Sequence, residues 1–278
     1  MKKLILFCDG GLGNRMNVVI GGMLLAKKLN RKIIINWPVN QWCGAAFDTL
    51  FDTNEYHIDD VNINDLFAIY KDDAAFVIHT NQTNLQLKYQ HNVYSSTVEY
   101  LQHVTNDVMI YYHNRIPEYH LNEEILDVLR SIPIQTNITD RVNRFCNTFN
   151  IDQTTLGVHL RRTDMELPPT INQVITLTQE YPKNKYFACS DDLDTERILD
   201  KLDNIITHDK QEYAQKYVNG NWHHPIVDAD GRRTNYNMLR SEQSVIDAFV
   251  DLLILAKTDI ITHTASTFVR LAKLYNKI

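Results

Sequence analysis

The second half of this 278-residue chain alternates short apolar runs with longer segments of helical pattern. Short apolar runs are typical of buried strands, and apolar residues recurring every three to four positions are typical of helices. The strand-like runs lie at 155–160, 185–189, 204–207 and 259–262, and the helical patterns lie at 171–181, 193–202, 241–257 and from Ser266 onward. Strands that alternate with helices form parallel sheets through right-handed crossovers. The pattern therefore predicts an α/β fold.

The N-terminus repeats this organisation on a smaller scale. An apolar run from Leu4 to Cys8, a Gly-rich turn, an apolar-patterned segment at 16–29 and a run at 33–35 predict a β-turn-α-β unit. Residues 37–120 are less regular, with candidate strands at 74–79 and 108–112.

Helical patterns at 121–129 and 138–149 are expected to connect two lobes. A chain of this length accommodates two domains of about 130 residues each. We therefore expect two Rossmann-like lobes with a cleft between them, at residues 1–150 and 151–278.

Charge and cysteine content limit the classes of partner. The 34 acidic and 28 basic residues leave a formal charge of −6, so there is no overall electrostatic reason to bind nucleic acid or an anionic membrane. Any anion site must therefore be local. The four cysteines are far apart in sequence and form no CxxC pair, which favours buried free thiols in a reducing compartment. The first apolar run is too short for a signal peptide, and no run approaches the roughly 18 residues of a membrane span. We expect a cytoplasmic protein.

The richest chemistry follows the strand at 155–160. His159, Arg161, Arg162 and Asp164 fall within six residues. Ligands of open α/β sheets bind at the carboxyl ends of the strands, and the arginine fork matches phosphate or carboxylate oxygens in pairs. Two arginines here indicate a diphosphate or polycarboxylate site. The alternative is a surface ion pair of little energetic weight.

The Gly-rich turn at residues 9–16 opens a helix, whose free N–H groups favour negative charge. Gly11 and Gly13 keep only part of a dinucleotide fingerprint, because Met16 replaces the third small residue and the next strand ends without an acid. A nicotinamide-dependent dehydrogenase is therefore disfavoured, and the absence of Gly-Lys-Ser/Thr excludes a P-loop. Two interpretations remain: a turn that lets Asn14 or the backbone approach a ligand, or glycines that serve packing.

Two further features lie near the C-terminus. Asp247 and Asp251 are spaced i, i+4 in an apolar helix; Asp247 is compatible with solvent, whereas Asp251 requires a partner, either a guanine edge or an arginine of the chain. Ser266 and Thr267 open the last helix and predict either an anion site or an N-cap.

The polar stretch at 219–240 has no clear period and contains Trp222-His223-His224-Pro225. Adjacent histidines suggest a metal, but a zinc site needs three or four organised ligands. We expect a solvated or acceptor-facing loop and no metal site.

Three motifs in this order, the Gly-rich turn, the His-x-Arg-Arg-x-Asp strand end and the helix-strand-Ser/Thr unit, resemble the fucosyltransferase superfamily of α1,6-, α1,2- and protein O-fucosyltransferases. The stretch at 157–164 is most similar to the α1,6 branch, which includes the rhizobial nodulation enzymes. The resemblance covers the second half well and the first half only at residues 4–20.

The resemblance implies a GT-B fold, GDP-β-L-fucose as donor substrate, inversion at the anomeric carbon, and neither a divalent metal nor another cofactor. It also implies that the lobe at 1–150 is on the acceptor side and that the lobe at 151–278 binds the nucleotide sugar. The resemblance also implies that Arg161 binds the β-phosphate and that Asn14 lies near the sugar and the acceptor. The residues implied at the nucleotide are Gly11, Gly13, His159, Arg161, Arg162, Asp164, Asp191, Asp192, Asp251, Ser266 and Thr267, with His159 and Asp251 reading guanine and Ser266 and Thr267 at the β-phosphate.

Two positions depart from the α1,6 branch, where a Lys and a catalytic Glu follow the Arg-Arg-x-Asp motif. Here those positions are Met165 and Pro169, and Glu166 is the nearby carboxylate that could replace the base. The expected acceptor is a glycan or a lipid-linked oligosaccharide. We expect no nucleic-acid partner and no transmembrane segment. The departures leave open a GDP-sugar-binding protein without transfer activity, a transferase of another GDP-linked deoxyhexose, and an unrelated anion-binding α/β protein.

Overall fold

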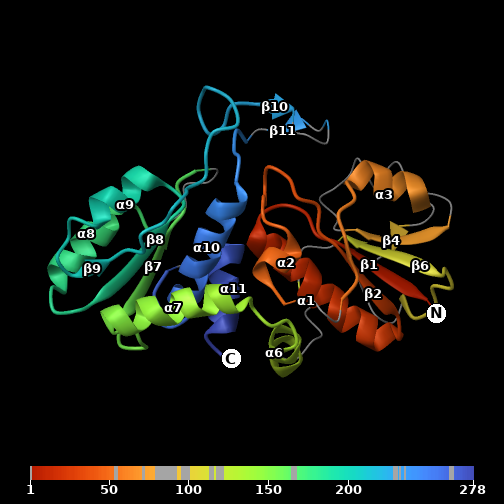
Figure 1. Cartoon of the computed structure of the whole chain (residues 1–278), viewed down its shortest axis with the longest axis horizontal. Coiled ribbons are helices and arrows are strands. Elements are labelled where there is room, and N and C mark those ends of the chain that lie inside the picture. Colours follow the sequence, from red (N-terminus) through yellow and green to blue (C-terminus); the bar gives the residue numbers. More distant parts are fainter. Residues whose placement is uncertain are drawn as a thin grey trace. The chain divides into compact units, whose positions relative to one another are not determined.

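The computed structural model describes residues 2–52, 56–70, 73–78, 93–94, 101–112, 116, 122–163, 168–227, 231, 233–234, 236–262 and 266–278. The chain forms two compact units (Figure 1). The first comprises Met1–Val39 and Ala46–Pro133, and the second comprises Asn40–Ala45 and Ile134–Ile278.

A parallel six-stranded sheet forms the centre of the first unit, with the strand order β3-β2-β1-β6-β4-β5. Its strands are β1 (Lys3–Phe7), β2 (Lys32–Asn36), β3 (Ile58–Asp59), β4 (Ala74–Ile78), β5 (Val93–Tyr94) and β6 (Val108–Tyr112). The helices of this unit are α1 (Leu12–Leu29), α2 (Phe47–Leu50), α3 (Ile63–Tyr70) and α6 (Asn122–Arg130). The strand order reverses direction at β1, so the turn after β1 lies at a topological switch point, where open α/β sheets bind ligands.

Strand β1 and helix α1 form the buried centre of this unit. Residues Leu4 to Phe7 are at most 1% exposed. Most residues of α1 are buried, and a side chain at Gly22 would place its Cβ 2.2 Å from the Leu6 side chain. This close approach of the helix to β1 explains the glycine at position 22. The helix begins at Leu12, one turn before the predicted start at residue 16.

The second unit contains a parallel four-stranded sheet in the order β12-β7-β8-β9. Its strands are β7 (Leu156–Leu160), β8 (Tyr186–Ser190), β9 (Ile205–Ile206) and β12 (Asp259–Ile260). The helices are α7 (Thr136–Phe149), α8 (Ile171–Glu180), α9 (Leu193–Leu199), α10 (Glu242–Leu255) and α11 (Thr267–Tyr275), and β10 (Ile226–Val227) pairs with β11 (Arg233–Thr234) in a separate antiparallel ribbon.

Successive side chains of β7 point to opposite faces of this sheet. Val158 and Leu160 join a core with Val174 of α8 and Leu199 of α9. On the other face a Cβ on Gly157 would lie 2.0 Å from Thr258 Oγ1, at the end of α10, so only glycine fits. Figure 1 accordingly shows α8 and α9 on one side of β7 and β8, with α10 and α11 on the other.

The predicted α/β alternation is confirmed in both units, including the candidate strands that became β4 and β6. The units divide between Pro133 and Ile134, not near residue 150. Helix α6 packs against α1 in the first unit and α7 packs against α10 in the second, so the two helices expected to connect the lobes belong one to each.

Residues 40–45 belong to the second unit although they lie between elements of the first. The backbone N–H of Arg240 donates to the Gln41 carbonyl at 2.8 Å. A Cβ on Gly44 would come within 2.3 Å of the Arg240 carbonyl oxygen, so this close approach also requires glycine. No local pattern in the sequence indicates that residues 40–45 pack with the second unit.

The four cysteines are free, as expected, and Cys8, Cys43 and Cys189 are buried while Cys146 is half-buried. Within the described part of the chain, no helix combines the length and the apolar character needed to cross a membrane.

Candidate functional site

His159 connects the end of β7 to the beginning of α11. Its backbone N–H donates to Thr262 Oγ1 at 2.8 Å, and its ring stacks on Phe268 of α11 with centroids 4.6 Å apart and planes at 23°. Because β12 and β7 are adjacent parallel strands, the residues that follow each of them lie at the same edge of the sheet. Arg161 and the N-terminus of α11 therefore share one corner of the second unit.

The His159 imidazole is neutral at pH 7. Burial lowers its pKa to about 4, since desolvation disfavours the charged form; the carboxylate of Asp191 opposes this effect and the guanidinium of Arg161 adds to it. The ring is only 7% exposed and its face is occupied by Phe268. In this arrangement the backbone of His159 joins β7 to Thr262, and one face of its ring is covered by Phe268.

Arg161 and Arg162 are adjacent in sequence but have separate surroundings. Arg162 Nη2 donates to the Pro169 carbonyl at 2.8 Å, so this guanidinium holds the loop before α8. Arg161 is half-buried on the His159 side, where its charge acts on the imidazole. The paired guanidinium groups expected from the sequence are thus divided, and Arg161 is the one at the corner with α11.

Asp191 fixes the turn that carries these arginines. Its Oδ1 accepts from the Arg162 backbone N–H at 2.7 Å, and its Oδ2 accepts from Thr163 Oγ1 at 2.6 Å. Both carboxylate oxygens therefore hold the end of β7 against the end of β8. The resemblance places Asp191 at the nucleotide, whereas its contacts here assign it to positioning the Arg161 turn.

Asp192 caps helix α9. Its side chain accepts from the Thr195 backbone N–H at 2.9 Å and from Thr195 Oγ1 at 2.7 Å. This is the usual bonding of an N-cap aspartate. The two adjacent aspartates after β8 thus perform different tasks, which their shared position in the sequence did not indicate.

Ser266 and Thr267 begin helix α11, and Ser266 occupies the N-cap position without making a side-chain cap hydrogen bond. Among the described residues, the buried Ser266 Oγ has no hydrogen-bond partner, and the residue is 4% exposed. Buried hydroxyl groups are normally paired, and helix N-termini favour anions. Ser266 is thus the N-cap residue of α11 without the side-chain bond of a cap, and this helix end remains a candidate anion site.

Asp251 of α10 is buried in an ionic cluster that the sequence did not reveal. Its Oδ2 contacts Lys210 Nζ at 2.7 Å and its Oδ1 contacts His208 Nδ1 at 3.0 Å. Lys210 also pairs with Glu196 of α9 and donates to the Ser190 carbonyl at 2.6 Å. Burial alone would lower the pKa of Lys210, but the charges of Asp251 and Glu196 outweigh it and raise that pKa. The partner of Asp251 is thus a lysine and a histidine, and both oxygens are occupied without a guanine edge.

Asp247 is fully buried, which contradicts the expectation that solvent satisfies it. It pairs with Arg141 Nη2 of α7 at 2.6 Å and accepts the backbone N–H groups of Gln211 and Glu212, both at 2.9 Å. Together, Asp247 and Asp251 attach the segment after β9 to α10. The i, i+4 spacing places both carboxylates on one side of α10, and their ion-pair and hydrogen-bond partners are residues distant in sequence.

The Gly-rich turn is held by a buried arginine. Gly10 has a positive φ of 79°, which favours glycine, and Gly11 is the N-cap residue of α1. Arg15 is 0% exposed, and its Nε donates to the Gly10 carbonyl at 2.7 Å while its Nη1 donates to the Pro38 carbonyl at 2.7 Å. Gly13 is buried in the first turn of α1, and Asn14 is half-buried beside Gly10. The turn is therefore rigid, and Asn14 is its partly accessible side chain.

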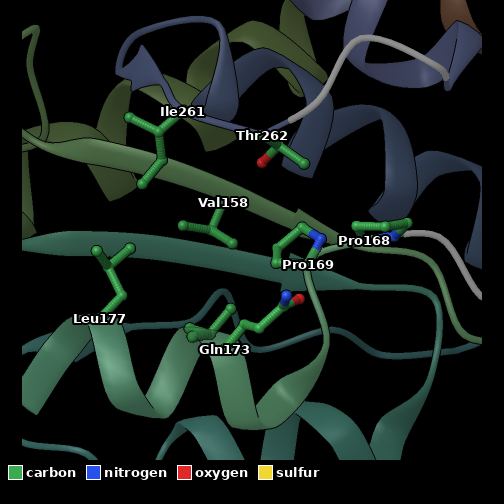
Figure 2. A pocket seen from close by; sticks show the side chains of 8 residues that line it. Val158, Pro168, Pro169, Gln173, Leu177, Ile261 and Thr262 are labelled. Carbon is green, nitrogen blue, oxygen red and sulfur yellow. The ribbon is translucent and has the colours of Figure 1, made fainter.

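A pocket of about 320 Å³ lies on the α8 face of β7. Figure 2 shows Gln173 and Leu177 of α8 pointing toward Val158, Ile261 and the two prolines. The lining residues are Val158, Pro168, Pro169, Gln173, Val174, Leu177, Ile261 and Thr262. Val158 and His159 point to opposite faces of β7, so this pocket is separate from the corner of Arg161 and α11.

Two predicted site residues, Asp164 and Glu166, lie outside the described residues, as do residues 263–265. In the part of the chain that the structure describes, no group of three or more His, Cys, Asp or Glu side chains is placed to hold a metal ion. Asn14, Gly11 and Gly13 belong to the first unit, and the other described site residues belong to the second.

No protein-family model matches this chain, and no curated protein matches it in sequence. Solved structures do match. The fucosyltransferase NodZ from Bradyrhizobium shares the fold with a TM-score of 0.63 and 14% identity, over 98% of this chain and 91% of that chain. NodZ α-1,6-fucosyltransferase soaked with GDP-fucose matches with a TM-score of 0.59, 14% identity and coverages of 99% and 92%.

POFUT1 in complex with GDP matches with a TM-score of 0.52 and 15% identity, over 99% of this chain and 94% of that chain. At these identities the likeness concerns the fold. The chain thus has the GT-B architecture of these fucosyltransferases over nearly its whole length, as the sequence resemblance predicted.

Proposed function

We propose that this protein is a fucosyltransferase that transfers L-fucose from GDP-β-L-fucose to a hydroxyl group of a glycan, with inversion and without a metal ion. One observation carries the proposal: Arg161 and the N-terminus of α11, with the buried Ser266 hydroxyl, share one corner at the carboxyl edge of the second sheet. The fold shared with NodZ and POFUT1 supports the choice of donor.

The corner suits a diphosphate leaving group. When the bond between fucose C1 and the β-phosphate oxygen breaks, its electron pair leaves with the diphosphate, and negative charge grows there. Arg161, the α11 N–H groups and the Ser266 hydroxyl are donors for that charge, and fixed donors stabilise a transition state more than a ground state. The acceptor oxygen forms the new bond from the opposite side, which inverts the anomeric carbon. Asn14 of the Gly-rich turn would orient the sugar or the acceptor.

The acceptor hydroxyl must give its proton to a base. Pro169 stands where the α1,6 branch has its glutamate, and its carbonyl accepts from Arg162. We assign the base to Glu166, three residues earlier. Exchange of Glu166 for glutamine would then lower kcat by at least about a hundredfold, in the range of general-base contributions, with a small effect on GDP affinity.

Incubation with radiolabelled GDP-fucose and a panel of oligosaccharide and lipid-linked acceptors tests the proposal. We expect labelled product and stoichiometric GDP, an α-linked anomeric proton by NMR, and equal rates with EDTA or added Mg²⁺. If the protein shows no transfer and no acceptor-independent hydrolysis of GDP-fucose in any condition, that result would contradict enzyme activity. Loss of activity in EDTA would contradict the metal-free mechanism.

A second candidate is a GDP-sugar-binding protein without transfer activity, and the proline at position 169 favours it. Such a protein would bind GDP tightly but would not cleave GDP-fucose to form GDP. A transferase of another GDP-linked deoxyhexose would instead consume that donor faster than GDP-fucose. An unrelated anion-binding protein would show no preference for GDP over UDP or ADP in a thermal-shift panel.

The proposal places the reaction in the cytoplasm, because three buried free cysteines suit a reducing compartment. The acceptor proposed there is a glycan or a lipid-linked oligosaccharide. Fractionation of the source cells, followed by immunodetection, would locate the protein.

A further inference from the structure

The segment between β9 and α10 presents aromatic rings to solvent. Tyr236 is 36% exposed, and its ring lies 5.9 Å from that of Trp42 and 6.1 Å from that of His223, centroid to centroid. His223 is exposed and Trp42 is half-buried. We call Trp42, His223 and Tyr236 the aromatic surface. All three belong to the second unit.

A buried asparagine holds this surface in shape. Asn237 is 0% exposed, and its side-chain oxygen accepts from the Val218 N–H at 2.8 Å while its Nδ2 donates to the Val218 carbonyl at 2.7 Å. The same Nδ2 donates to the Asn221 carbonyl at 3.2 Å, and the Asn237 backbone N–H donates to the Trp222 carbonyl at 2.7 Å. Asn237 thus joins the segment that carries Tyr236 to residues 218–222, which precede His223. We call these bonded residues the framework of the aromatic surface.

The framework is attached to the turn that carries Arg161. Met238 is 0% exposed, and its sulfur contacts Thr163 Oγ1 at 3.6 Å, while the proton of that hydroxyl is donated to Asp191 at 2.6 Å. Tyr236 is two residues before Met238. The segment that carries Tyr236 therefore contacts the turn that carries Arg161, at Met238 and Thr163.

We propose that the aromatic surface binds the sugar acceptor of the transfer reaction, an inference that rests on the proposed function. Aromatic faces carry partial negative charge, and the C–H groups on one side of a sugar ring carry partial positive charge, so the two stack. The Tyr236 hydroxyl and the His223 ring nitrogens add polar groups at the edge of the surface for sugar hydroxyls. A transferase needs its acceptor beside the donor diphosphate, and Met238, two residues after Tyr236, contacts Thr163 in the turn that carries Arg161.

The test uses the full chain and five variants. Tyr236→Ala and His223→Ala should raise the KM for the oligosaccharide acceptor roughly three- to tenfold, the range of one lost aromatic contact, and by more than the KM for GDP-fucose. Tyr236→Phe keeps the ring face and should recover most of the wild-type acceptor KM. Tyr181→Ala is the matched control, because Tyr181 is 54% exposed at the end of α8, outside the aromatic surface.

Tryptophan fluorescence gives a readout that needs no turnover. The oligosaccharides of the acceptor panel are titrated without GDP-fucose; at least one should quench wild-type emission, and Trp42→Phe should remove most of that quenching. Glycan binding that depends on Tyr236, in a protein that neither transfers nor hydrolyses GDP-fucose, would support the aromatic surface and contradict the proposed function. Fucose transfer with acceptor KM and quenching unchanged in Tyr236→Ala would overturn the aromatic surface and leave the proposed function intact.

Discussion

At the scale of single residues, Arg161 is the side chain on which the account of the chemistry depends. Its charge lowers the pKa of the His159 imidazole, whereas Arg162 is bonded to the Pro169 carbonyl. Arg161→Ala should lower the transfer rate by about a hundredfold or more, because one fixed donor to a developing anion contributes roughly 3 to 4 kcal/mol. Steady-state kinetics with GDP-fucose would measure the loss.

Arg161→Lys is the control for charge without the planar fork and should recover part of the rate. Arg162→Met should mainly lower the melting temperature, since the loop before α8 loses a hydrogen bond. A larger catalytic loss in Arg162→Met than in Arg161→Ala would contradict this division of roles.

His159 predicts a pH dependence of stability. Burial lowers its folded-state pKa from 6.5 to about 4. Between these values the unfolded chain binds a proton that the folded chain does not, so stability should fall as the pH decreases from 6.5 toward 4, by at most about 1.4 kcal/mol per pH unit from this group. Urea unfolding across that window measures the slope.

Carboxylates also titrate at the acidic end, so the slope needs a reference variant. His159→Gln removes the titrating ring and should give a flatter profile between pH 6.5 and 5. Identical profiles for the two proteins would show that His159 titrates normally, against the buried, stacked position described above.

At the scale of elements, the two aspartates after β8 offer a test of positioning. Asp191→Ala releases the Arg162 N–H and the Thr163 hydroxyl, so it should raise the KM for GDP-fucose and lower kcat. Asp192→Ala removes a helix cap and should cost about 1 kcal/mol of stability. Calorimetry and kinetics on both variants would separate the effects. An equal loss of GDP affinity in both would indicate instead that the pair binds the nucleotide.

The Lys210 cluster predicts a strong stability effect. Lys210→Met leaves Glu196 and Asp251 buried without their shared cation, which should cost about 3 to 5 kcal/mol. The triple exchange Lys210→Met, Glu196→Gln and Asp251→Asn removes all three charges and should recover much of that loss. Chemical denaturation measures both. A single variant as stable as the wild type would contradict a buried ionic cluster.

These elements also show which features the sequence could predict. The helices of the second unit and the strands of its four-stranded sheet follow from apolar periodicity, a local property, and they were predicted within a few residues. Strands β10 and β11 were not predicted, because the polar stretch at 219–240 that contains them has no clear period. The requirement of Asp251 for a partner also follows from its apolar surroundings. The identity of that partner does not, because Lys210 and Asp251 are far apart in sequence and meet only when the segment after β9 packs on α10.

At the scale of the whole molecule, the same distinction explains the division into units. The count of two α/β lobes follows from chain length and alternation, but the boundary depends on which partner each connecting helix packs against. Residues 40–45 belong to the second unit because they pack closely on the backbone at Arg240, as the approach at Gly44 shows. Arg15 carried a signal that sequence reasoning passed over: an arginine in the first turns of an otherwise apolar helix needs internal acceptors, and the Gly10 and Pro38 carbonyls supply them.

The central claim is that the corner formed by Arg161 and the N-terminus of α11 binds the diphosphate of a guanine nucleotide. Isothermal titration of GDP into the wild type, Arg161→Ala and Ser266→Ala tests it most directly, with UDP and ADP as competing nucleotides. We predict that the wild type binds GDP more tightly than UDP or ADP, and that both variants bind GDP at least about tenfold more weakly while remaining folded. Wild-type protein that does not bind GDP, or GDP binding that is unchanged in Arg161→Ala, would contradict the claim.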